Sequence, residues 1–308
     1  MRKALLLYNP LSGGRRARRL ADVEAAAAVL RNAGVEVSIA PTEGPRGSAQ
    51  QARHAASEGV DSVFACGGDG TVHDLLQGLV GTGASLGIIP LGTANTLAHD
   101  LRLPLTPVGA ARASLQASIR RIAVGQVGYQ DFAGNTATRY FTVTVGIGVD
   151  AHLFYRLNAA AKHRLGMTSY YWKATWLWLT HPLEYFRAEV SGNGRSGQVS
   201  VSQLLAVRIR NFGGVLRELA PGASLDRQDL RLVLFRTRSR ISYLRYIIRG
   251  LLGTAWQIEG IELADAERVE CPAAAPGQRV FVEADGELLG TLPAEISILP
   301  DALNLLVP

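Results

Sequence analysis

The segment Gly67-Gly68-Asp69-Gly70-Thr71 has the residue types of a phosphate-binding turn. Its glycines allow the backbone to come close to a ligand and to adopt positive φ angles. If a helix begins here, its first N–H groups and the positive end of its dipole attract an anion. A carboxylate by itself does not favour anion binding. Asp69 is explained if it accepts a proton or binds a magnesium ion next to the phosphate. The alternative is an ordinary strand-to-helix turn in which Asp69 caps the helix.

Two further loops are rich in glycine, serine, threonine and asparagine. The first runs from Asn9 to Arg16 and the second from Pro90 to Thr96, and each follows a short apolar segment. In a parallel sheet the carboxyl ends of the strands share one edge, and ligands bind at that edge. Three such loops at one edge are harder to explain as ordinary turns than one loop is.

The segments that must position these loops alternate between strand and helix patterns up to about residue 120. Such alternation predicts a mostly parallel sheet with helices on both faces. Gly34 and Gly59 follow two of the helical segments, where a helix C-terminal glycine is expected. The expected strands are 3–8, 35–40, 61–66 and 86–89, and the expected helices are 18–32, 48–57, 72–80 and 93–101.

After residue 120 the pattern becomes that of an antiparallel β domain. Several segments alternate polar and apolar residues, and Gly192-Asn193-Gly194 is a good hairpin turn. Helices are expected at 151–161 and 241–252, and a last strand at 294–307 returns to the first domain. The domains are then 1–122 with 294–308, and 123–293. The remaining expected strands are 121–127, 140–145, 184–191, 199–210, 231–236, 257–263 and 279–284.

The order of these motifs resembles the diacylglycerol kinase catalytic domain family, which includes bacterial lipid kinases, sphingosine kinases and ceramide kinases. The family pattern is N-P-x-S-G, then G-G-D-G-T, then P-x-G-T-x-N, and all three occur here in that order. The similarity continues through Gly146-Ile147-Gly148-Val149-Asp150 and ends at Asp285-Gly286-Glu287. G-G-D-G alone also occurs in NAD kinases and phosphofructokinases, whereas the five elements together are highly specific.

The resemblance implies a lipid kinase that transfers phosphate from ATP, with magnesium, to a diacylglycerol, a ceramide or a sphingoid base. Asp69 would be the base for the lipid hydroxyl, Glu287 the second acidic residue of the active site, and Asp150 a contact of the lipid head group. The first domain would bind the nucleotide and the second the lipid. The implied nucleotide contacts are Asn9, Ser12, Gly13, Thr42, Gly67, Gly68, Gly70, Thr71, Gly92, Thr93, Asn95, Arg164 and Asp285.

One departure from the family pattern concerns a structural magnesium ion. Many bacterial members carry an Asp-Asp-Gly run that helps to hold it. The corresponding segment here is 221–228, in which Arg227 and Gln228 replace the second aspartate and the glycine. We therefore expect no structural magnesium site in this segment.

Two segments bear on access to lipid. Residues 170–178 contain three tryptophans within seven positions, which is typical of a membrane interface or a lipid cavity. A buried helix packed on the sheet explains them equally well. Between Arg231 and Arg249, arginines alternate with aliphatic residues, which favours an amphipathic helix on an anionic membrane. The alternative is a solvated arginine face above an aliphatic face that is turned to the core.

Composition limits the remaining possibilities. The net charge of +6 favours anionic partners, but no nucleic-acid-binding module is recognisable. Cys66 and Cys271 are too few for a disulfide framework or a cysteine metal site. Since no apolar run has the length of a transmembrane helix, we expect a cytoplasmic protein that associates peripherally with membranes; a homodimer is compatible with the sequence. The functional alternatives are a soluble-substrate kinase of the NAD kinase type and a non-catalytic nucleotide- or membrane-binding protein.

Overall fold

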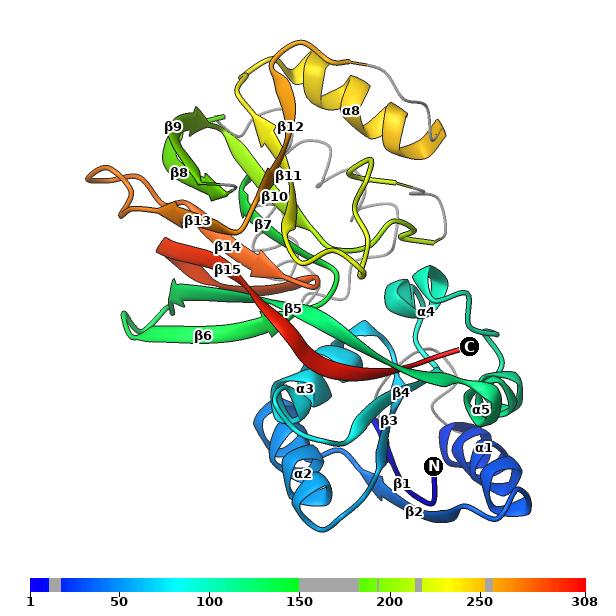
Figure 1. Cartoon of the computed structure of the whole chain (residues 1–308). Helices are drawn as coiled ribbons and strands as arrows, with labels where there is room; N and C mark the ends of the chain where they lie inside the picture. Colours follow the sequence, from blue (N-terminus) through cyan, green and yellow to red (C-terminus); the bar gives the residue numbers. More distant parts are fainter. Residues whose placement is uncertain (11–17, 150–182, 193, 214–217, 253–256) are drawn as a thin grey trace. The chain divides into compact units, whose positions relative to one another are not determined.

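The computed structural model describes residues 1–10, 18–149, 183–192, 194–213, 218–252 and 257–308 (Figure 1). Internal contacts divide the chain into two compact units. The first comprises residues 1–124, 211–215 and 299–308, and the second comprises residues 125–210 and 216–298.

The first unit is built on a parallel sheet. β1 (Lys3–Tyr8) lies between β2 (Glu36–Pro41) and β3 (Ser62–Gly67), and β3 pairs with β4 (Ser85–Pro90). The last residues of β15 (Glu287–Val307) add to the far side of β4, also in parallel. The chain thus moves from β1 outward to β2 and then returns to β3 on the other side of β1. Such a reversal marks the place where open parallel sheets bind ligands.

Helices cover both faces of this sheet (Figure 1). α1 (Arg19–Asn32) packs with α5 (Pro107–Gln116) on one face, and α2 (Pro45–Ser57) packs with α3 (Asp69–Leu79) on the other. The α2–α3 packing is so close that a Cβ on Gly78 would overlap the carbonyl oxygen of Ala49. On the opposite face, alanines of α1 and α5 share a core with β1, β3 and β4: Ala26, Ala27, Ala110, Ala111, Leu6, Phe64 and Ile89.

The second unit contains a run of antiparallel strands around β7 (Thr144–Gly148). On one side β7 pairs with β10 (Gln203–Val207), which is followed by β11 (Leu230–Phe235) and β12 (Ile261–Ala266). On its other side β7 pairs with β14 (Phe281–Ala284), and β14 pairs with the first residues of β15. α8 (Arg240–Leu252) packs on β11.

A second run of strands in this unit begins further along β15. There β15 pairs with β13 (Arg268–Cys271), which is followed by β8 (Phe186–Gly192) and β9 (Arg195–Val201). β5 (Ser118–Gln130) pairs with β15 and with β6 (Thr136–Phe141). Both runs contribute to a single core, so they pack as two layers that share β15. Members of this core include Phe141, Ile147, Leu204, Leu232, Val269 and Ile296.

The predicted fold class is confirmed, a parallel α/β region followed by a mostly antiparallel β region, but several element boundaries were wrong. α3 begins at Asp69 rather than at residue 72. The expected strand 140–145 is interrupted between β6 and β7, and the expected strand 199–210 is interrupted at Ser202. There Ser202 Oγ bonds to the carbonyl oxygens of Phe235 (3.2 Å) and Thr237 (2.5 Å). α4 (Thr96–Asp100) is shorter than predicted, and α5 and β13 were not predicted.

None of the helices in the described ranges has the length and apolarity that a bilayer crossing requires. The predicted helix at 151–161 and the tryptophan-rich segment 170–178 lie outside the described residues.

Candidate active site

Strand ends of the first unit lie in a row along the carboxyl edge of the parallel sheet. Backbone hydrogen bonds continue one residue beyond the strands. Thr42 N donates to Tyr8 O (2.9 Å), and Asn9 N donates to Cys66 O (3.3 Å). Thr42 is thereby placed beside the end of β1, and Asn9 beside the end of β3. The sheet reverses its strand order between β1 and β3.

The glycine turn, residues 67–71, joins β3 to α3 in this row. Gly68 is the N-cap residue, with φ −97° and ψ −167°, and Asp69 is the first residue of the helix. Only glycine fits at Gly67, because a Cβ there would overlap the Thr71 hydroxyl. The first N–H groups of a helix lack intrahelical acceptors, and the dipole end there is positive. The turn therefore offers donors and a positive potential to an anion.

The loop after β4 contacts the glycine turn directly. Leu91 N donates to Gly67 O (2.8 Å), and a Cβ on Gly92 would overlap the Cα of Gly68. Asn95 has a left-handed backbone (φ 49°). Its Oδ1 accepts from Gly92 N (2.9 Å) and its Nδ2 donates to Gly92 O (3.0 Å). The Asn95 side chain therefore holds this loop in shape, and its predicted nucleotide contact stays a prediction.

The Asp69 carboxylate ties these two loops together. Its Oδ1 accepts a hydrogen bond of 2.6 Å from the backbone N of Thr96, the first residue of α4. The alternative in which Asp69 caps its own helix is wrong, since Gly68 is the N-cap and no side-chain capping bond is made. Asp69 is half-buried. Within the described residues no other hydrogen bond involves its carboxylate, and its predicted role as the base stays a prediction.

Arg19 also supports the site, although no sequence pattern singled it out. It is 3% exposed, and its Nη1 donates to Leu91 O (2.8 Å), directly before Gly92. A buried arginine needs such acceptors. The only sequence signal for this residue was the basic run 15–19.

Burial raises the pKa of the neighbouring Cys66 thiol, although the Arg19 cation opposes this effect. Cys66 is thus an unreactive core residue.

In the second unit, Asp285 and Gly286 form the two-residue turn between β14 and β15. Both have positive φ angles, 48° and 82°, as a type I′ hairpin turn requires. The turn places Glu287 opposite Ala284 on the paired strands. Glu287 is half-buried. Glu287 is the first residue after this turn, so the paired strands fix the position of its backbone.

The carboxylate of Asp285 holds the connection between β6 and β7. Its Oδ1 accepts from Val143 N (3.0 Å) and Thr144 N (2.9 Å), and its Oδ2 accepts from Thr142 N (3.1 Å). Both oxygens are therefore used for the fold. The predicted nucleotide contact of Asp285 stays a prediction, and the structure gives this residue a structural role that the sequence did not indicate.

Glu283 is a buried carboxylate beneath the same turn. It is 1% exposed, and its Oε2 accepts from Gly286 N (3.1 Å). A Cβ on Gly146 would lie 2.7 Å from Oε1 of Glu283. The first glycine of the segment 146–150 therefore makes room for this side chain. Sequence reasoning missed Glu283, because nothing in its own strand distinguishes it from an exposed glutamate.

Several predicted residues are not brought together by the described coordinates. Ser12, Gly13, Asp150 and Arg164 lie outside the described residues. Thr93 is exposed in the loop after β4, and Gly70 lies in the first turn of α3. Asp69 belongs to the first unit and Glu287 to the second, and their membership of one active site stays a prediction.

Arginine side chains make the main polar contacts of segment 221–228, in which we expected no structural magnesium site. Arg227 makes a two-pronged ion pair with Asp229 (Nε–Oδ1 2.6 Å, Nη2–Oδ2 2.8 Å), and its Nη2 also lies 2.8 Å from Asp265 Oδ1. The hydrogen bonds to Asp229 raise the pKa of Arg227. The fully buried Arg208 donates to the carbonyl oxygens of Arg227 (2.9 Å) and Asp229 (2.7 Å).

These contacts do not fit a structural magnesium ion in the segment. The guanidinium of Arg227 occupies the space between the carboxylates of Asp229 and Asp265 that a cation would need. Burial lowers the pKa of Arg208 to about 10, which still leaves it charged at neutral pH. In the ranges that the structure describes, no three His, Cys, Asp or Glu side chains are arranged to hold a metal ion.

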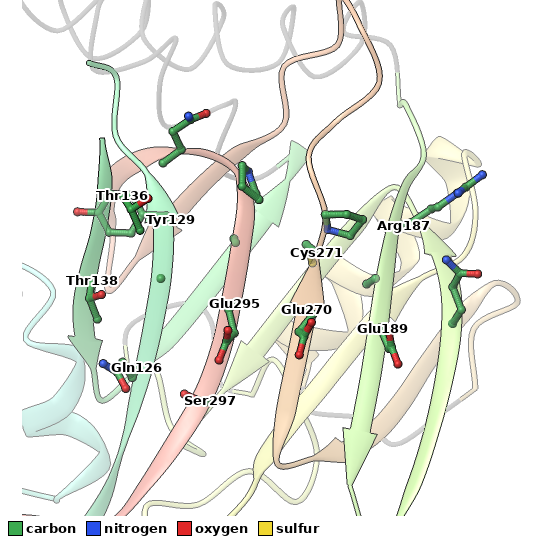
Figure 2. A pocket seen from close by; sticks show the side chains of 17 residues that line it. Gln126, Tyr129, Thr136, Thr138, Arg187, Glu189, Glu270, Cys271, Glu295 and Ser297 are labelled. Carbon is green, nitrogen blue, oxygen red and sulfur yellow. The ribbon is translucent and has the colours of Figure 1, made fainter. Parts of the chain in front are cut away.

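A hollow of about 580 Å³ lies on the open face of β5, β15, β13 and β8 in the second unit (Figure 2). Glu189, Glu270 and Glu295 stand opposite one another on three adjacent strands. Arg268 pairs with Glu270 (2.8 Å) and with Glu295 (3.0 Å). The row of carboxylates makes this surface unsuitable for the phosphates of a nucleotide. The glycine turn is therefore the candidate site for chemistry.

The comparisons with known proteins agree with this geometry. Residues 3–127 match the diacylglycerol kinase catalytic domain, and residues 143–307 match the YegS C-terminal NAD kinase beta sandwich-like domain. The chain belongs to the diacylglycerol kinase catalytic domain family. It is thus a lipid kinase, a phosphotransferase, and its C-terminal part is the β-sandwich of the YegS-like branch.

Relatives span nearly the whole kinase. A diacylglycerol kinase of Mycobacterium tuberculosis (strain H37Rv) is 32% identical over 315 residues, which cover 99% of this chain and 95% of the relative. A diacylglycerol kinase of Bacillus subtilis (strain 168) is 28% identical over 312 residues, covering 100% and 97%. Among solved structures, a diacylglycerol kinase from Bacillus anthracis has a TM-score of 0.70 at 20% identity and covers 99% of this chain and 97% of its own.

Yeast NADH kinase, solved in complex with NADH, shares the fold more distantly. Its TM-score is 0.51 at 11% identity, over 100% of this chain and 84% of that one. A likeness at this identity concerns the fold alone. The family membership favours the lipid kinase prediction over both functional alternatives.

Proposed function

We propose that this lipid kinase transfers the γ-phosphoryl group of ATP to the hydroxyl of a lipid alcohol, with diacylglycerol as the first candidate acceptor. The observation that carries the proposal is the similarity, over nearly the whole chain, to two proteins named diacylglycerol kinase. Ceramide and sphingoid bases remain the other candidate acceptors. The first unit would bind the nucleotide, and the second would bind the lipid.

The phosphates of ATP would bind at the N-terminus of α3. The absence of side chains at Gly67 and Gly92 lets Thr71 and the loop after β4 pack closely against the glycine turn. The Leu91–Gly67 hydrogen bond and the Asp69–Thr96 hydrogen bond keep the two loops in register. A magnesium ion bound with ATP would neutralise phosphate charge, and it needs only one or two carboxylates besides the phosphate oxygens.

Asp69 would accept the proton of the lipid hydroxyl during transfer. The hydrogen bond from Thr96 N to Oδ1 restrains the carboxylate in one orientation. Oδ2 is then the oxygen for the substrate proton, as a general base requires within hydrogen-bond reach. Glu287 would supply the second acidic group. The lipid would be met at the cytoplasmic face of an anionic membrane, with which a chain of net charge +6 associates favourably.

The deciding experiment is a transfer assay with radiolabelled ATP and a panel of acceptors. Diacylglycerol, ceramide and sphingosine would be presented in mixed micelles, and NAD would be included as a soluble acceptor. We expect labelled phosphatidic acid and weaker or no labelling of the other lipids. Transfer to NAD with no labelled lipid would overturn the proposal in favour of the NAD kinase type.

A further inference from the structure

α8 turns its aliphatic residues toward solvent. With about 100° of rotation per residue, these outward residues span an arc of roughly 140° on one side of the helix. A surface helix of a soluble protein normally directs such a stripe at the core. The alternative with a core-facing aliphatic side, which the sequence left open, is therefore wrong. The outward residues are Ile241, Leu244, Ile247, Ile248 and Leu252, each 40–64% exposed.

The opposite side of α8 is fixed against the β unit by aromatic and polar contacts. The rings of Tyr243 and Tyr246 pack on Phe235 with centroid separations of 4.6 and 4.9 Å. The hydroxyl of Tyr243 lies 2.9 Å from Ser202 Oγ, and that of Tyr246 donates to Leu219 O (2.7 Å). Rotating the helix to bury its aliphatic side would break all of these contacts. The outward aliphatic side is thus built into the fold.

The charges on and before α8 are all positive. The helix sequence, residues 240–252, contains three arginines and neither aspartate nor glutamate. Arg245 is exposed beside the aliphatic side, and in the described part of the chain no acidic side chain pairs with it. Just before the helix, Arg238 is exposed and stacks over the ring of Tyr185 at 4.5 Å. A partner that covers this surface must be apolar beneath and anionic at its rim.

We propose that the outward side of α8 is a docking surface for an anionic lipid bilayer. The helix would lie in the membrane plane, with its isoleucines and leucines below the head groups and Arg245 among the lipid phosphates. Its 13 residues are too short to cross a bilayer, because they extend only about 20 Å at about 1.5 Å per residue. A second copy of the chain fits less well, since it would bring the arginines of two helices together.

This inference rests on the proposed function in one respect: a lipid substrate is the reason why the protein would contact a bilayer. Vesicle binding is therefore measured without ATP or diacylglycerol, by cosedimentation with phosphatidylcholine vesicles that contain or lack phosphatidylglycerol. We expect Ile241→Asn with Ile248→Asn to weaken binding by about tenfold or more. Arg245→Gln should weaken binding about fivefold on anionic vesicles and hardly at all on neutral ones.

Matched controls come from exposed positions of the first unit. Leu105 and Ile119 are 49% and 62% exposed, so Leu105→Asn with Ile119→Asn removes a similar apolar area. Arg53→Gln removes an exposed charge from α2. Both controls should bind vesicles like the parent. Transfer to a short-chain, water-soluble diacylglycerol should be unchanged in every variant, and this readout separates docking from catalysis.

The outcomes distinguish the possible occupants of this surface. Parent-like vesicle binding by the Ile241→Asn, Ile248→Asn variant would overturn the proposal. It would also be overturned if the parent failed to bind vesicles but self-associated in light scattering, with the variant monomeric, because the occupant would then be a second copy. If vesicle binding depends on α8 while no lipid is phosphorylated, the docking surface stands and the proposed function falls.

Discussion

Asp69 and Asp285 each precede a glycine in a turn, but their carboxylates have different hydrogen bonds. Both oxygens of Asp285 accept hydrogen bonds from backbone N–H groups of residues 142–144, which connect β6 to β7. Asp69 uses only Oδ1 within the described residues, for Thr96 N. Both oxygens of Asp285 are therefore used by the fold, whereas the described contacts of Asp69 use only one of its oxygens.

This difference separates two positions that the family resemblance assigns to one active site. Resemblance implied that Asp69 acts in catalysis and that Asp285 contacts the nucleotide. The geometry predicts that loss of Asp69 affects turnover and that loss of Asp285 affects stability first. Substitutions at both positions, measured for activity and unfolding together, can sharpen or break this distinction.

Asp69→Asn should have the largest effect. The amide retains an oxygen that accepts from Thr96 N, so the loops should remain joined and the melting temperature nearly unchanged. Loss of a general base lowers kcat by about 10²–10⁴-fold, whereas ATP affinity should change little because backbone N–H groups hold the phosphates. The measurements are kcat on a short-chain diacylglycerol and ATP binding by calorimetry. Parent-like turnover would remove Asp69 from the mechanism.

Asp285→Ala should act mainly on stability. It leaves three N–H groups in a partly buried loop without their acceptor, and it puts alanine at a positive φ of 48°. We expect the free energy of unfolding to fall by about 3 kcal/mol, measured by urea denaturation. Asp285→Asn keeps one acceptor oxygen and tolerates the left-handed backbone, so it should lose less. An unchanged unfolding curve with a strongly raised KM for ATP would instead make Asp285 a nucleotide contact.

The order of strands and helices, and the glycine turn itself, could be predicted because their signals are local. Apolar segments, glycines at helix ends and the Asp285-Gly286 turn act within a few residues. α5 had a local signal that was overlooked: Pro107 at its first position, and Thr106 as N-cap, whose hydroxyl accepts from Gly109 N (3.3 Å). Its existence was therefore predictable in principle.

The contacts that shape the candidate site were not predictable from local pattern. The hydrogen bond of Asp69 to Thr96 spans 27 residues, and those of Asp285 to residues 142–144 span 141–143. The same distant partner explains the break in the expected strand 140–145, because Asp285 takes the N–H groups that a sheet ladder would use. Tertiary contacts of this kind override the strand pattern of the segment.

Glu287→Gln tests the residue that is predicted to be the second acidic group of the active site. Unlike Asp285, Glu287 is not needed for the turn, whose geometry depends on the positive φ angles of Asp285 and Gly286. We expect kcat to fall by about tenfold or more, with a stability change below about 0.5 kcal/mol. Thermal melting and single-turnover rates decide the outcome. Early melting with a matching activity loss would make Glu287 structural, and a stable, fully active variant would exclude it from the active site.

The smallest expected effect concerns Arg227, whose guanidinium pairs with the carboxylates of Asp229 and Asp265. The side chains of Arg227 and Asp229 are 29% and 28% exposed. Because the pair is partly solvated, Arg227→Gln should lower the free energy of unfolding by only about 1 kcal/mol. The loss should shrink at high salt, which screens the same charges in the parent. EDTA should leave the melting temperature of the nucleotide-free parent unchanged.

The double variant Arg227→Asp, Gln228→Gly sharpens this test, because it creates an Asp-Asp-Gly run after Leu225 and removes the internal cation. Carboxylates that lose their arginine repel one another, so the variant should be less stable than the parent in EDTA. Millimolar Mg²⁺ should then raise its melting temperature, since an ion that binds only the folded state stabilises it by mass action. Ca²⁺ is a useful second ion, because it tolerates less regular oxygen geometry.

A parent that melts earlier in EDTA would contradict the role of Arg227. A double variant whose melting temperature responds to neither ion would also contradict it, because the carboxylates would then not bind a cation in place of the arginine.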